Sequence, residues 1–156
     1  DYAVKWLNQA TKAVQLGEKK VADGEADLYP YYKNVIQMAR IWRAYLNSEV
    51  SDGFGPIPAL DAFSGVPGEY DSVEAIYTFI LKELKEAEAA LDPSIDMSPM
   101  SAEDAFYAGN VNMWKKYVYS SAASDVYKRQ DQRYVPYLEC TGDVRYIQES
   151  RGRLGK

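Results

Sequence analysis

Between Asp71 and Leu91 apolar side chains recur every three or four positions, and this period constrains the fold more than any other feature of the chain. Lysines and glutamates fall between them, as in an amphipathic helix that buries one face. Asp71 and Glu74 have the spacing of a capping box, and Asp92-Pro93 ends the pattern. The segment therefore predicts a helix. Its apolar positions are Val73, Ile76, Tyr77, Ile80, Leu81, Leu84, Ala87 and Leu91.

Two earlier segments also predict helices. The first runs from Tyr2 to about Leu16, with Gly17 as its C-terminal stop and a charged turn over residues 19–27. The second begins with Pro30 at its first helical position and ends near Ser51. The first should bury Ala3, Leu7, Ala10 and Val14; the second should bury Val35, Met38, Ala39, Trp42, Tyr45, Leu46 and Val50, with Lys33, Arg40, Arg43 and Asn47 largely off that face.

The remaining segments read as loops and one further helix. Glycine and proline are dense between Gly53 and Gly68, which predicts a long loop of the kind that often carries function. After a polar connector that runs to about Asp104, Asn110 or Asn112 can cap a fourth helix. That helix would carry Val111, Trp114, Tyr117 and Val118. No strand pattern competes, so the predicted class is all-α.

Composition excludes several functions. The chain has 18 Lys and Arg against 23 Asp and Glu, so a phosphate-tracking surface for nucleic acid is not expected. It has no histidine, the commonest general base and a frequent metal ligand. No apolar run is long enough to span a bilayer, and the first residues are neither an initiator Met nor a signal segment. We expect these residues to begin inside a longer protein.

Residues 120–130, SSAASDVYKRQ, resemble the translation of an oligonucleotide adapter used in shotgun sequencing libraries. All eleven positions match, so we interpret them as a cloning scar and residues 131–156 as an unrelated or disordered tail. The charge changes there as well: residues 1–119 carry a net charge of −7 and residues 120–156 a net charge of +2. Cys140 lies in the tail and receives no role. The alternative is that the segment simply continues a natural helix, since it contains helix formers and no breaker.

The carboxylates do not predict chemistry. Glu83, Glu86 and Glu88 have the helical spacing of a solvated face rather than of a glycosidase acid and base. Asp61, Asp92, and Asp96 lack the ligand spacing of a calcium loop. We therefore expect no enzyme activity, no metal and no cofactor.

Five segments follow one another along the chain: Ala39–Tyr45, Gly53–Pro58, Tyr70–Tyr77, Leu84–Leu91 and Tyr107–Tyr117. In this order they resemble the SusD/RagB family of nutrient-binding lipoproteins of the bacterial outer membrane. The family pattern is a Gly-Asp-Ile/Val-Pro turn, a helix that opens with Ile-Tyr, and a later helix with a Trp-Lys pair near its start. Pro56 and Ala59 stand where the family usually has Asp and Tyr.

The resemblance covers about residues 1–119 and implies a partial helical scaffold of tetratricopeptide-like helix pairs with a long Gly/Pro loop. It implies non-catalytic capture of an oligosaccharide, or another nutrient, for a SusC-like TonB-dependent transporter. It also implies a cell-surface location through an N-terminal lipid anchor that would lie upstream. A generic tetratricopeptide-like protein-interaction module is the alternative.

Sugar rings stack their C–H faces on aromatic side chains, so exposed aromatics are the candidate ligand contacts. Phe54, Phe63 and Tyr70 occupy or flank the Gly/Pro loop, and Tyr29 and Tyr32 cluster at the start of the second helix. The same residues could instead pack the loop or the helix entry.

Overall fold

The computed structural model describes residues 2–60 and 68–128, and over this part of the chain it contains helices, turns and one isolated β-bridge. The all-α prediction is confirmed. None of the described helices combines the length and apolarity needed to cross a membrane. The elements are α1 (Tyr2–Ala22), α2 (Glu25–Leu28), α3 (Tyr32–Phe54), α4 (Val73–Ala90), the 3-10 helix η1 (Ser98–Met100) and α5 (Val111–Lys128).

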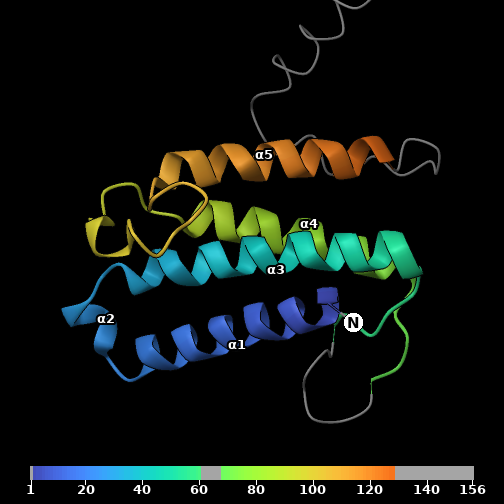
Figure 1. Cartoon of the computed structure of the whole chain (residues 1–156), viewed down its shortest axis with the longest axis horizontal. Helices are drawn as coiled ribbons and strands as arrows, with labels where there is room; N and C mark the ends of the chain where they lie inside the picture. Colours follow the sequence, from blue (N-terminus) through green and yellow to red (C-terminus); the bar gives the residue numbers. More distant parts are fainter. Residues whose placement is uncertain (1, 61–67, 129–156) are drawn as a thin grey trace, which may run out of the picture. The chain divides into compact units, whose positions relative to one another are not determined.

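The chain divides into two compact units, Asp1–Ala122 and Ala123–Lys156. Within the first unit the long helices α1, α3, α4 and α5 follow one another in alternating directions (Figure 1). α3 packs against both α1 and α4 and so lies in the middle of the helix array. Such stacked antiparallel pairs are the arrangement expected of a tetratricopeptide-like scaffold.

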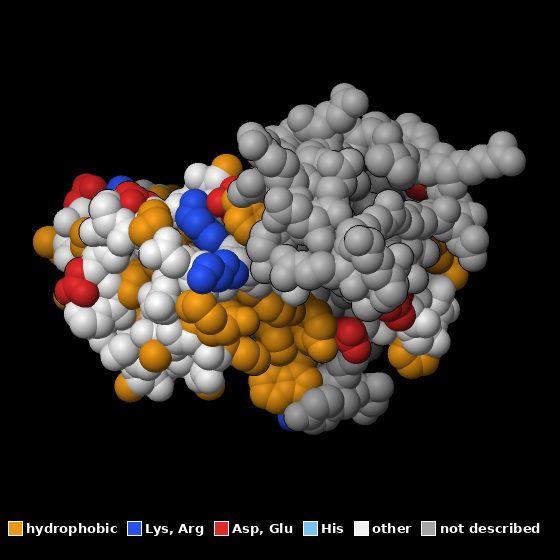
Figure 2. Space-filling view, turned by 90° about the horizontal axis from the view of Figure 1, so that it is seen from above, with side chains coloured by type: hydrophobic (Ala, Val, Ile, Leu, Met, Phe, Trp, Pro, Cys, Tyr) orange, Lys and Arg blue, Asp and Glu red, His pale blue; other side chains and the backbone are white. Residues whose placement is uncertain are grey.

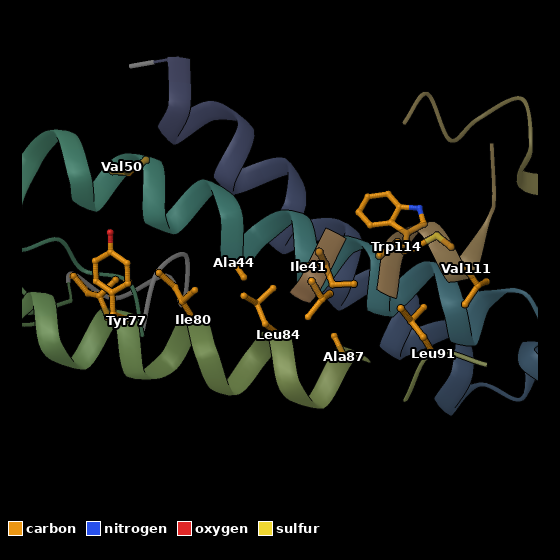
Figure 3. Packing of buried hydrophobic residues seen from close by; sticks show 14 of the residues in the cluster. Ile41, Ala44, Val50, Tyr77, Ile80, Leu84, Ala87, Leu91, Val111 and Trp114 are labelled. Carbon is orange, nitrogen blue, oxygen red and sulfur yellow. The ribbon is translucent and has the colours of Figure 1, made fainter. Parts of the chain in front are cut away.

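The main core lies between α3, α4 and the first turns of α5. Ile41 and Ala44 of α3 face Ile80, Leu84 and Ala87 of α4, and none of these side chains is more than 2% exposed (Figure 3). Val111, Trp114 and Val118 of α5 complete the cluster. The predicted apolar face of α4 is confirmed from Ile76 onward, and that of α5 at Val111, Trp114 and Val118. Val73, in the first turn of α4, is 40% exposed, so its predicted burial is wrong.

A smaller hydrophobic cluster joins α1 to α3. In this region α1 is longer than predicted. Leu7, Ala10 and Val14 are buried as predicted, but the helix continues through Gly17 to Ala22. A Cβ atom on Gly17 would lie 2.5 Å from Cγ1 of Ile36. Gly17 therefore serves close helix packing and does not end the helix. The helix ends instead at Ala22, two residues before Gly24, which adopts the left-handed conformation with φ of 81°.

The predicted bounds and faces of α3 also need correction. Pro30 lies two residues before the first helical residue, Tyr32, and the helix ends at Phe54 rather than near Ser51. Asn47, predicted off the apolar face, is only 1% exposed. α3 is covered by α1 on one side and α4 on the other, so it buries more of its circumference than a one-faced helix.

Asp71 does not cap α4 as predicted. Ser72 is the N-cap, and its hydroxyl accepts a hydrogen bond from the backbone N–H of Ala75 at 3.2 Å. The Asp71 carboxylate accepts from the N–H groups of Ala59 and Leu60 at 2.8 and 2.9 Å. Asp71 thus closes the base of the Gly/Pro loop. The predicted stop at Asp92-Pro93 is confirmed, since α4 ends at Ala90.

Asn110, one of the two predicted caps, directly precedes Val111, the first residue of α5, and caps the helix. Its side-chain oxygen accepts from the N–H of Met113 at 3.2 Å. α5 continues from Val111 to Lys128 without a break at Tyr119 or Ser120. Residues 120–128 contain helix formers, so a helix there does not depend on their origin. The assignment of residues 120–130 to an adapter and of residues 131–156 to a tail stays a prediction.

Glu83 is buried, which corrects its prediction as part of a solvated face. Its side chain lies between two arginines of α3: Arg40 Nη2 is 2.7 Å from Glu83 Oε1, and Arg43 pairs with Oε2. Arg40 also reaches Glu86 Oε2 at 2.7 Å. Burial alone would raise the pKa of Glu83, but the hydrogen bonds and charges of the two arginines outweigh it and lower that pKa.

Candidate ligand-binding site

An open groove of about 450 Å³ lies where the junction of α2 and α3 faces the connector after α4. One wall contains two tyrosines, and the other contains an aspartate and a serine, so apolar and polar surfaces meet across a small volume. The lining residues are Leu28, Tyr29, Pro30, Tyr31, Ser94, Ile95, Asp96 and Pro99.

The tyrosine wall follows from local backbone chemistry. Proline disfavours helical geometry in the residue before it, and Tyr29 adopts φ of −129° and ψ of 75°. The N–H of Tyr32 donates to the carbonyl of Tyr29 at 3.1 Å, which closes a turn directly before α3. This turn brings Tyr29, Tyr31 and Tyr32 together and leaves Tyr29 47% exposed.

The three tyrosines form one ring cluster. The ring of Tyr29 lies 6.0 Å from that of Tyr31 and 5.9 Å from that of Tyr32, and Tyr31 and Tyr32 are 4.8 Å apart. Lys20 of α1 lies over the Tyr32 ring at 5.1 Å and pairs with Glu25 at 2.7 Å. The hydrogen bond to Glu25 raises the pKa of Lys20. The contacts on Tyr29 and Tyr31 limit their ring motion before any ligand arrives.

A buried asparagine holds the two walls together. Asn34 of α3 is fully buried, and its amide donates to the carbonyl of Asp92 at 2.8 Å while its oxygen accepts from the Asp92 N–H at 2.9 Å. The same amide lies 3.4 Å from the sulfur of Met97. Sequence analysis missed Asn34. The available signal was a polar residue one turn before Met38, on a face expected to be apolar.

Two matched turns shape the connector wall. Asp92 accepts from the N–H and hydroxyl of Ser94 at 2.8 and 2.7 Å, and Asp96 accepts from the N–H and hydroxyl of Ser98 at 2.9 and 2.6 Å. These hydrogen bonds lower the pKa of Asp92 and of Asp96. Both carboxylates therefore stay ionised at neutral pH.

The structure does not bring the five predicted ligand residues together. Tyr29 lines the groove and Tyr32 supports it, whereas Phe54 and Tyr70, 72% and 77% exposed, flank the Gly/Pro loop. α3 spans the distance between the two groups, about 35 Å for its 23 residues at 1.5 Å per residue. Phe63 lies outside the described residues. The predicted site therefore separates into two ends of the first unit.

A second aromatic surface connects α3 with the loop before α5. Phe106, 58% exposed, lies 4.9 Å from the Trp42 ring and 5.9 Å from the Trp114 ring, and Trp42 stacks on Tyr45 at 5.1 Å. Trp114 is buried, as predicted; Trp42 is only partly so. Seen from the α5 side, hydrophobic side chains gather in one area beside Lys and Arg (Figure 2).

No group of three or more potential metal ligands occurs among the described residues. In the connector, each of Asp92 and Asp96 is engaged by its own serine. Asp61, the third predicted oxygen donor, lies outside the described residues. The groove thus offers ring faces and hydrogen-bond acceptors, a combination suited to holding a polyol.

Comparison with protein families matched residues 1–121 to SusD-like_2, described as starch-binding associating with outer membrane. Comparisons with curated proteins and with solved structures gave no significant match.

Proposed function

Because the chain belongs to the SusD-like family, described as starch-binding and associating with the outer membrane, we propose that it captures oligosaccharides at the cell surface for import. The tyrosine groove between Tyr29 and Asp96 is the observation that carries this proposal. Pyranose rings have apolar C–H faces for the tyrosines and hydroxyl donors for the carboxylate and serine oxygens. The proposed activity is binding without catalysis, so a change in glycan chain length on incubation would contradict it.

Titration calorimetry of the full chain with maltohexaose tests the proposal. We expect saturable binding, weakened about three- to tenfold by Tyr29→Ala, because an aromatic contact is worth about 0.5–1.5 kcal/mol beyond the area it buries. Tyr29→Phe should retain most of the affinity. Tyr70→Ala, which removes an equally large exposed ring at the opposite end, is the matched control and should bind as the wild type does.

The outcomes separate the site from the function. Loss of binding in Tyr70→Ala or Phe54→Ala, with Tyr29→Ala unaffected, would show that the ligand binds at the Gly/Pro loop. It would contradict the assignment of the binding site to the groove. Tyr32→Ala should have an intermediate effect, since Tyr32 supports the Tyr29 ring at 5.9 Å without lining the groove. No binding of any starch oligosaccharide by the wild type would contradict glycan capture itself.

We also propose a partner, a TonB-dependent transporter of the SusC kind that receives the glycan. Support is the family description, which associates the protein with the outer membrane. A gene for such a transporter beside this one, and co-purification of the two proteins from outer membranes, are the expected results.

A tetratricopeptide-like protein-interaction module is the competing function, favoured by the antiparallel helix pairs. Further helical repeats upstream, in place of a lipoprotein signal ending in Cys, would support that competitor.

A further inference from the structure

We propose that Asp96 makes the groove selective for oligosaccharides without acidic groups, which extends the glycan binding proposed for this site and rests on it. Among the eight described residues that line the groove, Asp96 is the one that carries a charge. An acidic sugar bound against the tyrosines would bring its carboxylate close to that of Asp96. A neutral sugar would present a hydroxyl donor at the same place.

The polar groups of the connector wall all favour donors on the ligand. The Ser94 hydroxyl donates its hydrogen to Asp92, so the Ser94 oxygen presents lone pairs to the groove. Asp96 is a carboxylate and accepts only. Uronate and sulfate groups are acceptors themselves, so this wall offers them no partner. Hydroxyl groups can donate to both residues.

Nearby positive charges do not cancel Asp96. Lys20 beneath the tyrosines is paired with Glu25 at 2.7 Å, and Lys115 is paired with Glu88 at 3.2 Å. Lys33 acts on Asp92 rather than on Asp96, and Asp92 is itself a second negative charge four residues away. The hydrogen bonds from Ser98, which lower the pKa of Asp96, keep the carboxylate ionised over the neutral range.

The test compares two α-1,4-linked hexamers, maltohexaose and hexagalacturonate, by titration calorimetry on the full chain at low salt. The wild type should prefer maltohexaose. Asp96→Asn should reduce that preference about three- to tenfold, the size expected for one solvent-exposed charge a few ångströms from another. Raising the salt to about 0.5 M should reduce the wild-type preference as well, because ions screen the repulsion.

Two variants control for the local turn. Asp92→Asn removes the carboxylate of the neighbouring Asp–Ser turn; Asp92 itself does not line the groove, although its partner Ser94 does. Ser98→Ala removes the turn contact but keeps the Asp96 charge. Both should change the preference less than Asp96→Asn does. Circular dichroism confirms that each variant keeps its helix content.

An unchanged preference in Asp96→Asn, with maltohexaose still bound, would overturn the selectivity and leave glycan capture standing. An equal change in Asp92→Asn would overturn it too, because the effect would then not depend on the groove. Failure of the wild type to bind either hexamer would overturn both proposals together.

Discussion

At the scale of single residues, the spacing of polar side chains in the sequence does not show which of them are buried between helices. Glu83 has the sequence position of an exposed helix residue, yet Arg40 and Arg43 enclose it from α3. Asn34 sits among apolar residues and holds a connector more than fifty positions away in the chain. A buried charge such as Glu83, or a buried amide such as Asn34, is stable only when its partners are in place. Each of these two residues therefore connects two elements of the fold.

Glu83→Gln should destabilise the protein by about 1–3 kcal/mol. The amide keeps the shape but loses the negative charge, which leaves Arg43 without its ionised acceptor and Arg40 with Glu86 alone. Chemical denaturation monitored by circular dichroism measures the difference. The neighbouring Glu86→Gln is the control and should change the free energy of unfolding by less than about 1 kcal/mol, because Glu86 is half-exposed.

Glu83 should also contribute to acid sensitivity. Its pKa is lowered in the folded state from the ordinary value of 4.5, so an unfolded chain binds more protons below that pH. Its stabilisation is fully present above pH 4.5 and is lost as the pH falls through the lowered folded pKa. Melting temperatures recorded from pH 7 to pH 3 should therefore decline less steeply in Glu83→Gln than in the wild type. Equally steep declines in the two proteins would show that Glu83 does not contribute to the loss of stability in acid.

Asn34→Leu should cost about 2–4 kcal/mol despite its similar volume. The N–H and the carbonyl of Asp92 would each lose a hydrogen bond to a fully buried side chain. Glycan affinity should fall together with stability, since Asn34 holds the connector wall beside the tyrosine wall. Unfolding curves and maltohexaose titrations of the same preparation measure both; a variant as stable as the wild type would contradict this account of Asn34.

At the scale of elements, two glycines in the long helices differ in whether the fold has room for a side chain at their position. Gly17 lies where α1 approaches Ile36 of α3, whereas Gly53 near the end of α3 has no atom within 4 Å of an added Cβ. Neither has a positive φ. The difference is therefore one of space between helices and not of backbone geometry.

Gly17→Ala should destabilise the protein by about 1–3 kcal/mol, because the new methyl group overlaps Ile36 at the helix contact. Gly53→Ala should stabilise it by up to about 1 kcal/mol, the usual gain in a helix. Thermal unfolding of the two variants checks both signs. Adding Ile36→Ala to Gly17→Ala should recover part of the loss; an additive further loss would mean that the two side chains do not meet.

At the scale of the whole molecule, we propose that the folding unit and the family segment coincide. The first compact unit ends at Ala122, and the family match covers residues 1–121. The buried core residues of this unit extend no further than Val118.

A chain ending at Ala122 should keep the melting temperature of the full chain within about 2 °C and the same maltohexaose affinity. A loss of more than about 1 kcal/mol of stability would show that the tail supports the first unit.

The proposed adapter origin of residues 120–130 makes a separate prediction: genomic reads should not run unbroken across the Tyr119–Ser120 junction. An unbroken natural reading frame there would contradict it.

Sequence alone determined the helical class, most of the apolar faces of α4 and α5, the cap at Asn110 and the stop at Asp92-Pro93. These features depend on side-chain periodicity and on the local chemistry of helix ends, which neighbouring residues specify. Tertiary structure decided the burial of Glu83, the helical Gly17, the loop contacts of Asp71 and the pairing of the tyrosine turn with the Asp96 connector. Each of these depends on two segments far apart in the chain, and the spacing within either segment does not specify its partner.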